Sequence, residues 1–168
     1  VAPLGTALTE SQVEELWKRM PDVQKIPILC FDGDGAGQRA ASRALARIMP
    51  ILKPDMSAKF AFLPEGHDPD SLLKEQGFTS MRKVLDEAIS LFDMLWLEEA
   101  KTRDLAQPEA LAGLKASLIK RVKEIENNDV RELFLSQINQ KFNEFYSSKT
   151  LSKNNARSSK ALKRKDAK

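Results

Sequence analysis

Short apolar runs alternate with helical patterns in the first half of the chain. Residues 25–31 form a short apolar run after Lys25, as expected for a strand buried on both faces of a sheet, and residues 58–64 have the character of a second strand. Residues 9–20, 37–49 and 68–77 have the periodicity or the terminal signals of helices. This alternation predicts an α/β domain with parallel strands.

Local signals mark the ends of these elements. Thr9 and Gln12 have the spacing of a capping box, which places a helix start at Thr9. Asp68 is expected to cap the helix that Gly77 ends. The first five residues have the character of a strand end. The chain therefore enters the α/β region from a further strand.

The pattern becomes entirely helical after about residue 78. Residues 79–103, 108–127 and 129–146 each repeat apolar positions at helical spacing, which predicts a three-helix bundle. Its expected core, on the same spacing, consists of Leu91, Phe92, Met94, Leu95, Trp96, Leu111, Leu114, Leu118, Leu133, Leu135, Ile138 and Phe142. The apolar stripe of the first helix, including Trp17, is likewise expected in a core.

Charge is distributed unevenly along the chain. The 168 residues have a net charge of +3, yet residues 147–168 contain eight lysines and arginines and one aspartate, so the first 146 residues are net −4. The terminal segment is polar and aperiodic, which predicts a disordered basic tail that serves as a linker or as a weak phosphate-binding arm. The body is not a basic nucleic-acid binder by overall charge.

Composition also excludes several classes of protein. No run approaches the roughly 20 apolar residues of a membrane span, and no signal-peptide pattern is present. Cys30 is the single cysteine, which excludes an internal disulfide, and its place in an apolar run predicts a buried side chain. One cysteine and one histidine cannot supply the four ligands of a zinc site. We expect a cytoplasmic protein with no membrane partner.

Two aspartates end the first apolar run. Asp32 and Asp34 are two residues apart, so their side chains point to the same side at the carboxyl end of a strand, where ligands bind in open parallel sheets. A hard divalent cation would remove the repulsion between the two carboxylates. Gly33, Gly35 and Gly37 allow a tight loop that a nucleotide phosphate can approach. Metal beside phosphate is the function that this stretch indicates, and a helix-entry turn rich in aspartate and glycine is the alternative that DxDG alone leaves open.

A second pair follows the next strand. Asp68 and Asp70 are again two residues apart, and parallel strands would bring both pairs to one edge of the sheet. Four carboxylates there could hold one or two metal ions. Helix capping explains Asp68 and Asp70 equally well without a metal, so both interpretations stay open. His67 is expected to be a loop residue rather than a ligand.

Two other families have related acidic motifs. An EF-hand is excluded because Ala36 and Arg43 occupy positions five and twelve of a loop beginning at Asp32, where acidic or amide ligands are required. A haloacid-dehalogenase-type phosphatase has a DxDx(T/V) motif after an apolar strand. Here Ala36 replaces the threonine or valine, and no downstream lysine and acidic pair is evident, which makes this the weaker alternative.

The two acidic motifs together resemble a known family. DGDGAGQRAASRAL, residues 32–45, followed by FLPEGHDPDSLL, residues 62–73, resembles the TOPRIM segment of bacterial DNA primase of the DnaG type. LGTALTESQ before them, and PEALAGLKASLIKRV…VRELFLSQI after them, resemble the adjoining parts of the same family. The resemblance covers most of the chain from Leu4 to about Tyr146. It implies an incomplete TOPRIM parallel-sheet domain followed by a helical bundle and a basic tail.

The resemblance implies a nucleotidyltransferase that copies single-stranded DNA into short RNA from ribonucleoside triphosphates. Asp32 and Asp34 would be catalytic and hold Mg²⁺ or Mn²⁺, and Asp68 and Asp70 match further acidic metal positions of the family. The glycines at 33, 35 and 37 would contact the nucleotide. Gly5 and Thr6 would lie near the site.

The resemblance also implies boundaries. Residues 1–77 correspond to the C-terminal part of the TOPRIM domain, 78–146 to the helical subdomain and 147–168 to a flexible linker. The family's glutamate motif, its basic N-terminal half and its zinc-binding domain are expected before Val1, and its helicase-binding domain after the linker. We therefore expect a primase fragment that is inactive alone. A non-catalytic TOPRIM-like scaffold or interaction module is the alternative.

Overall fold

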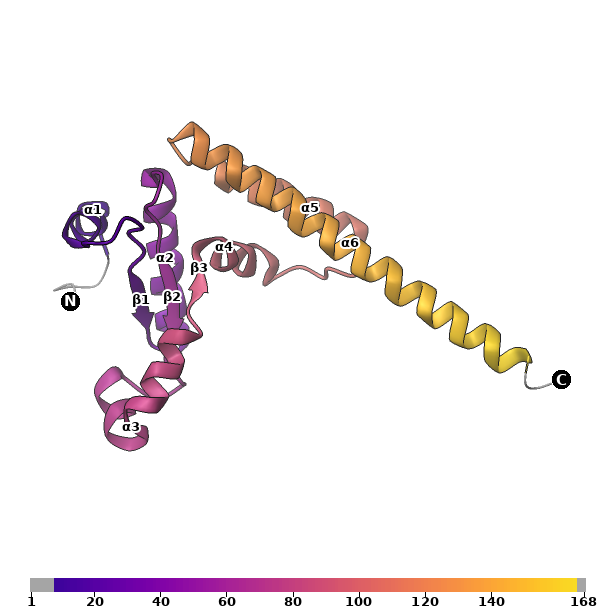
Figure 1. The fold of residues 1–168 in the computed structure, drawn as a ribbon, viewed down its shortest axis with the longest axis horizontal. Helices are drawn as coiled ribbons and strands as arrows, with labels where there is room; N and C mark the ends of the chain where they lie inside the picture. Colours follow the sequence, from indigo (N-terminus) through magenta and orange to yellow (C-terminus); the bar gives the residue numbers. More distant parts are fainter. Residues whose placement is uncertain (1–7, 166–168) are drawn as a thin grey trace.

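The computed structural model describes the backbone of residues 8–165 and the side chains of residues 8–146 (Figure 1). The expected strand end in the first five residues lies outside this range. The elements follow in the order α1 (Glu10–Arg19), β1 (Ile28–Phe31), α2 (Gly35–Ile51), β2 (Lys59–Phe62), α3 (Pro69–Asp86), β3 (Ile89–Ser90), α4 (Leu91–Ala100), α5 (Pro108–Val122) and α6 (Asn128–Lys165). The predicted α/β class is confirmed.

The described sheet has the strand order β1-β2-β3. β1 and β2 are parallel, as predicted, with Phe31 opposite Phe62. β3 is antiparallel to β2 and was not predicted. The single helix expected over residues 79–103 is wrong, because Ile89 pairs with Phe60 and Ser90 caps a new helix by accepting a hydrogen bond from the Asp93 backbone N–H.

Helix α1 begins as its sequence predicts. The Thr9 hydroxyl accepts from the Gln12 backbone N–H at 3.3 Å, and the Thr9 N–H donates to the Gln12 side chain at 2.9 Å. Trp17 is 1% exposed, and its indole N–H donates to the Ser57 carbonyl oxygen at 2.9 Å. The indole therefore fastens α1 to the segment before β2.

The sheet packs its aromatic face on the helices. Phe60 is buried with α1, α2 and α4 in the main core, and Leu29, Phe31 and Phe62 pack against that cluster. Strand residues alternate between faces, so Cys30 lies on the opposite face, where it is exposed. The expectation of a buried Cys30 is wrong, because the apolar core of the described residues covers mainly one side of β1.

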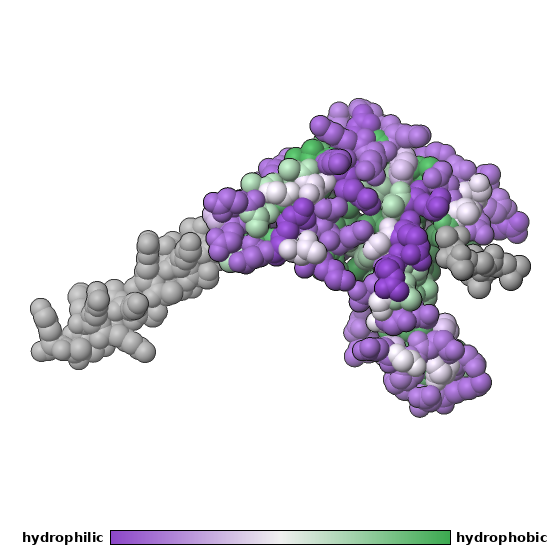
Figure 2. All heavy atoms as spheres, turned by 180° about the vertical axis from the view of Figure 1, so that it is seen from behind, coloured by the Kyte–Doolittle hydropathy of each residue, from purple (hydrophilic) through white to green (hydrophobic). Residues whose placement is uncertain are grey.

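The second half contains the expected helical core. Leu91, Leu95 and Leu114 are at most 1% exposed, and Trp96 packs on Phe142 with ring centroids 5.1 Å apart. Leu133, however, is 70% exposed, because it lies nine residues before Phe142 and so half a turn around α6. The exposed large apolar side chains are distributed from Val23 to Tyr146, and the surface view shows mostly hydrophilic residues between smaller apolar areas (Figure 2).

Helix α6 continues to Lys165, which corrects the prediction that the chain is disordered from residue 147. No glycine or proline interrupts the sequence after Asn128, and lysine, arginine, alanine and leucine all favour helix. Low apolar content therefore did not prevent a regular backbone. Among the described residues, no helix is both long and apolar enough to cross a membrane.

Candidate functional site at the strand ends

The two acidic loops leave the sheet at the same edge. The register of the parallel strands places Phe31 opposite Phe62, and the Leu63 N–H donates to the Phe31 carbonyl oxygen at 2.9 Å. The loops then touch at Gly33, where a Cβ atom would collide with the Leu63 carbonyl oxygen and lie 3.0 Å from the Glu65 nitrogen. The prediction that the two acidic loops leave the sheet at one edge is therefore confirmed by the positions of their backbones.

Asp32 and Asp34 differ in what they contact. The Asp34 carboxylate caps α2 by accepting a hydrogen bond from the Gly37 N–H at 2.7 Å. Asp32 is exposed and forms no side-chain hydrogen bond or ion pair with any residue that the structure describes. The pKa of the nearby Cys30 thiol is raised mainly by partial burial, and the charge of Asp32 raises it further. Asp32 is thus the free carboxylate of the first loop.

The glycines of this loop allow backbone segments to pack closely. A Cβ atom at Gly37 would lie 2.7 Å from the Asp32 carbonyl carbon, so only glycine lets the first turn of α2 rest on that residue. A Cβ atom at Gly35 would meet only the Arg39 guanidinium, at 3.3 Å. Packing within the chain accounts for Gly33 and Gly37. A nucleotide contact at the three glycines stays a prediction.

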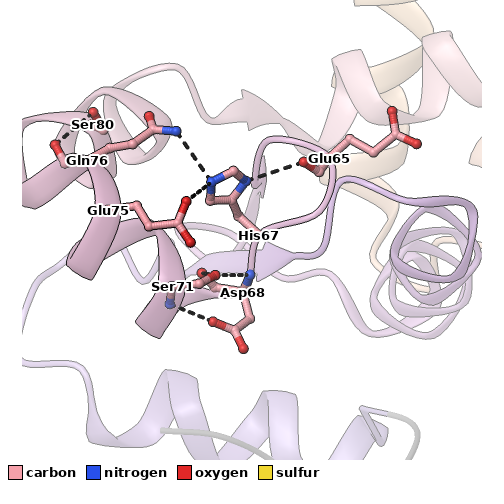
Figure 3. Close-up of polar contacts among 7 residues, drawn as sticks. All are labelled: Glu65, His67, Asp68, Ser71, Glu75, Gln76 and Ser80. Carbon is pink, nitrogen blue, oxygen red and sulfur yellow. Dashed lines mark hydrogen bonds and ion pairs between the residues drawn. The ribbon is translucent and has the colours of Figure 1, made fainter.

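The second loop places Asp68 and Asp70 at the start of α3, and Figure 3 shows the contacts of Asp68 with Ser71. Asp68 caps the helix by accepting from the Ser71 N–H at 2.7 Å, and its own N–H donates to the Ser71 hydroxyl at 2.9 Å. The hydrogen bond from the Ser71 backbone is the main reason that the pKa of Asp68 is lowered. Asp70 accepts from Lys74 at 2.6 Å. The capping role of Asp68 is confirmed, and metal binding by Asp68 and Asp70 stays a prediction.

His67 is a loop residue, as expected. Its Nδ1 lies 3.3 Å from the Glu65 carbonyl oxygen, and its Nε2 lies 3.2 Å from a carboxylate oxygen of Glu75 (Figure 3). The Gln76 amide contacts the same Nε2 at 3.4 Å. The ring therefore connects the loop to α3.

The described residues do not assemble a complete metal site. No group of three or more acidic, histidine or cysteine side chains within residues 8–146 is arranged to hold an ion. Asp32 and Asp34 still fit a partial site, since Mg²⁺ commonly binds one or two protein carboxylates and takes its other oxygens from water and phosphate. Gly5 and Thr6, expected nearby, lie outside the described residues.

One basic feature beside this site was missed in the sequence. Arg39, Arg43 and Arg47 are exposed on α2, and none forms an ion pair or hydrogen bond with a described residue. We call these three residues the arginine row. Their regular spacing of four was visible in the sequence, but the net negative charge of residues 1–146 hid it.

Comparison with known proteins gives the same family for both parts of the chain. Residues 1–73 match the Toprim-like family model. DNA primase of Pasteurella multocida is 38% identical over 125 residues, which cover 73% of this chain and 21% of the relative. A DNA primase domain from Pseudomonas aeruginosa has 33% identity and a TM-score of 0.72, over 82% of this chain and 42% of that one. A DnaG primase catalytic domain bound to single-stranded DNA has 27% identity and a TM-score of 0.68, over 82% and 43%.

The chain spans about a fifth of the length of the curated relatives that it matches. The match continues through the helical half, which the Toprim-like model does not include. These similarities favour the primase family over the phosphatase and over a non-catalytic scaffold.

Proposed function

This chain matches the TOPRIM and helical segments of bacterial DnaG-type primases, and on that basis we propose that it is part of a DNA primase. The reaction is metal-dependent nucleotidyl transfer, which joins ribonucleoside triphosphates into a short RNA on a single-stranded DNA template. A solved DnaG catalytic domain bound to single-stranded DNA supports the template as a partner. A replicative helicase is the further partner that the family resemblance suggests.

The observation that carries this proposal is the parallel register of β1 and β2. It brings the Asp32 loop and the Asp68 loop to one edge of the sheet, in contact at Gly33. That edge, beyond the carboxyl ends of parallel strands, is where α/β sheets bind ligands. The first turn of α2 adds backbone N–H groups and the positive end of a helix dipole, which favour a phosphate.

Asp32 and Asp34 are the residues that would hold Mg²⁺ or Mn²⁺. Bound there, the ion would activate the attacking hydroxyl and neutralise charge on the reacting phosphate. The Gly37 N–H fixes one oxygen of Asp34, which orients the carboxylate and leaves the other oxygen available. Asp32 has both oxygens available to a ligand. Asp68 and Asp70 would join only if their contacts with Ser71 and Lys74 rearrange.

Primer synthesis by a longer polypeptide tests this function. The N-terminal half of a DnaG-type polymerase region is joined before Val1, and labelled ribonucleotide incorporation is measured on a single-stranded template with Mg²⁺. We expect Asp32→Asn or Asp34→Asn to abolish synthesis while binding of single-stranded DNA is largely kept. Asp86→Asn, at the exposed end of α3, removes the same charge outside the site and should leave synthesis unchanged. Full synthesis with both Asp32 and Asp34 changed would refute the assignment.

Metal binding has a readout that does not depend on activity. In the 168-residue chain, Mn²⁺ should broaden the amide resonances around Asp32 more than those around Asp86, because broadening falls steeply with distance from the ion. Asp34→Asn should weaken the effect. Equal broadening at the two positions would mean that no ion binds at the strand end.

A further inference from the structure

The arginine row sets α2 apart from the rest of the body. The helix contains three arginines and no acidic residue, in a region of the chain that is net −4. All three side chains are exposed, and no carboxylate among the described residues pairs with them. Some exposed cations elsewhere pair, for example Lys74 with Asp70 and Arg19 with Glu15, so the distinguishing feature of the row is three unpaired arginines on one helix without an acidic residue.

The arginine row runs along α2 away from the candidate site. Residues four apart on a helix lie on one face with a rise of about 6 Å, so Arg39, Arg43 and Arg47 extend over about 12 Å. The row begins at the candidate site, since the Arg39 guanidinium reaches back to within 3.3 Å of a Cβ position on Gly35, the residue after Asp34. It then follows α2 away from the ends of β1 and β2 (Figure 1).

This spacing is unfavourable for the isolated helix. Like charges at positions i and i+4 destabilise a helix by about 0.2–0.5 kcal/mol per pair, and the row contains two such pairs. A line of anions at similar spacing would reverse the sign of that interaction. Phosphates fit, because the planar guanidinium donates two parallel hydrogen bonds to phosphate oxygens and stays charged at any physiological pH.

We infer that the arginine row binds consecutive phosphates of a single-stranded nucleic acid that leads away from the Asp32–Asp34 loop. The inference rests on the proposed function, in which that strand is the DNA template. Helix α2 has no aromatic residue on which bases could stack. The row therefore holds the strand by its backbone, without reading the sequence.

The test measures how salt weakens binding of a fluorescent 12-nucleotide DNA strand to the 168-residue chain. Removing one arginine–phosphate interaction makes the slope of log affinity against log salt concentration shallower by about 0.7 for a single strand. Changing Arg39, Arg43 and Arg47 together to Gln should therefore make the slope shallower by about 2. Gln and Arg have similar helix propensities, and a circular dichroism melt checks that α2 is kept.

A matched triple variant distinguishes the effect of the arginine row from the effect of losing three positive charges elsewhere on the surface. Arg82, Lys120 and Lys123 are exposed and unpaired among the described residues, and changing them to Gln removes the same charge from α3 and from the C-terminal end of α5, where Lys123 is the C-cap residue. We expect this variant to keep the native slope, and the Arg→Lys triple in the row to keep it as well. Three results would overturn the inference. The slope could become equally shallower in both Gln triples, it could stay unchanged in the row variant, or the native chain could show no salt-dependent binding.

The same measurements distinguish this inference from the proposed function. Asp32→Asn should leave the salt slope unchanged, since it removes no phosphate contact of the row. A row variant that binds normally, in a polypeptide whose synthesis still depends on Asp32, would refute the row alone. A shallower slope without Asp32-dependent synthesis would keep the row as a nucleic-acid surface and refute the enzyme assignment.

Discussion

Gly37 supports the first turn of α2 on the backbone of Asp32, and this contact has no room for a Cβ atom. We predict that Gly37→Ala lowers the free energy of unfolding by about 1–3 kcal/mol, because the backbone must move to relieve the overlap. Gly35→Ala is the matched control, since its Cβ would meet only the end of the flexible Arg39 side chain. Urea unfolding of both variants measures the difference. Equal stability would mean that the Asp32 backbone moves freely.

Cys30 allows a test of the exposed face of the sheet. We predict that N-ethylmaleimide modifies the folded chain at Cys30, because the side chain is exposed. The reaction at pH 7 should be slower than for an ordinary thiol, since partial burial and the charge of Asp32 raise the pKa and reduce the thiolate fraction. The rate should increase with pH, and Asp32→Asn should increase it at pH 7. Modification only after unfolding would contradict the exposed position.

These residues show what a sequence can predict locally. The caps at Thr9 and Asp68 were predictable because each bond joins residues three apart. The exposure of Cys30 was not, because it depends on which segments cover each face of the sheet. The neighbours of Gly33 and Gly37 were equally invisible, although the need for glycine in the loop was clear.

Two glycines in helical segments give opposite predictions for one chemical change. Gly77 interrupts α3 with φ +75° and ψ −179°, a conformation that is almost exclusive to glycine. Gly113 lies inside α5, where a Cβ atom would come no closer than 4.0 Å to the Arg103 side chain. We predict that Gly77→Ala destabilises the chain by about 1–3 kcal/mol and that Gly113→Ala stabilises it by about 0.4–1 kcal/mol.

Thermal or urea unfolding of the two variants checks both signs. An equally stable Gly77→Ala variant would show that α3 can straighten into one helix without loss. A destabilised Gly113→Ala variant would show that the α5 position is tighter than its 4.0 Å clearance indicates.

Element boundaries were predictable where a sequence signal was strong. Gly77 was expected to end a helix, and the structure has a kink there. The two-residue strand Ile89–Ser90 was missed, because two residues show no periodicity and the flanking sequence is helical. The extension of α6 to Lys165 was missed for a different reason: weak hydrophobicity is typical of disorder, yet no residue that breaks helices is present.

At the scale of the whole molecule, parallel strand order explains why acidic motifs over thirty residues apart in sequence meet at one edge. That much followed from the alternation of strands and helices. The sequence did not show which of the four carboxylates cap a helix and which stay unpaired, because Asp34 and Asp68 are in positions suited both to capping and to metal binding. The packed structure shows the caps made and Asp32 free.

The last prediction is that the 168-residue chain alone makes no RNA primer. Ions that act on both the attacking and the leaving oxygen need a set of ligands that fixes them in line. The described residues contain no group of three candidate ligands. Asp32 and Asp34 are available, whereas Asp68 and Asp70 are engaged with Ser71 and Lys74. A further ligand must therefore come from outside the described residues.

The assay is incorporation of labelled ribonucleotides on a single-stranded template with Mg²⁺, with the longer polypeptide as the positive control. The isolated chain should still bind the template through its basic residues, so a negative result would reflect the missing ligands rather than a failure to bind. Restoring a glutamate-bearing N-terminal segment should restore synthesis, whereas the same segment with that glutamate changed to Gln should not. Template-dependent RNA made by the isolated chain would show that the aspartates at this sheet edge suffice.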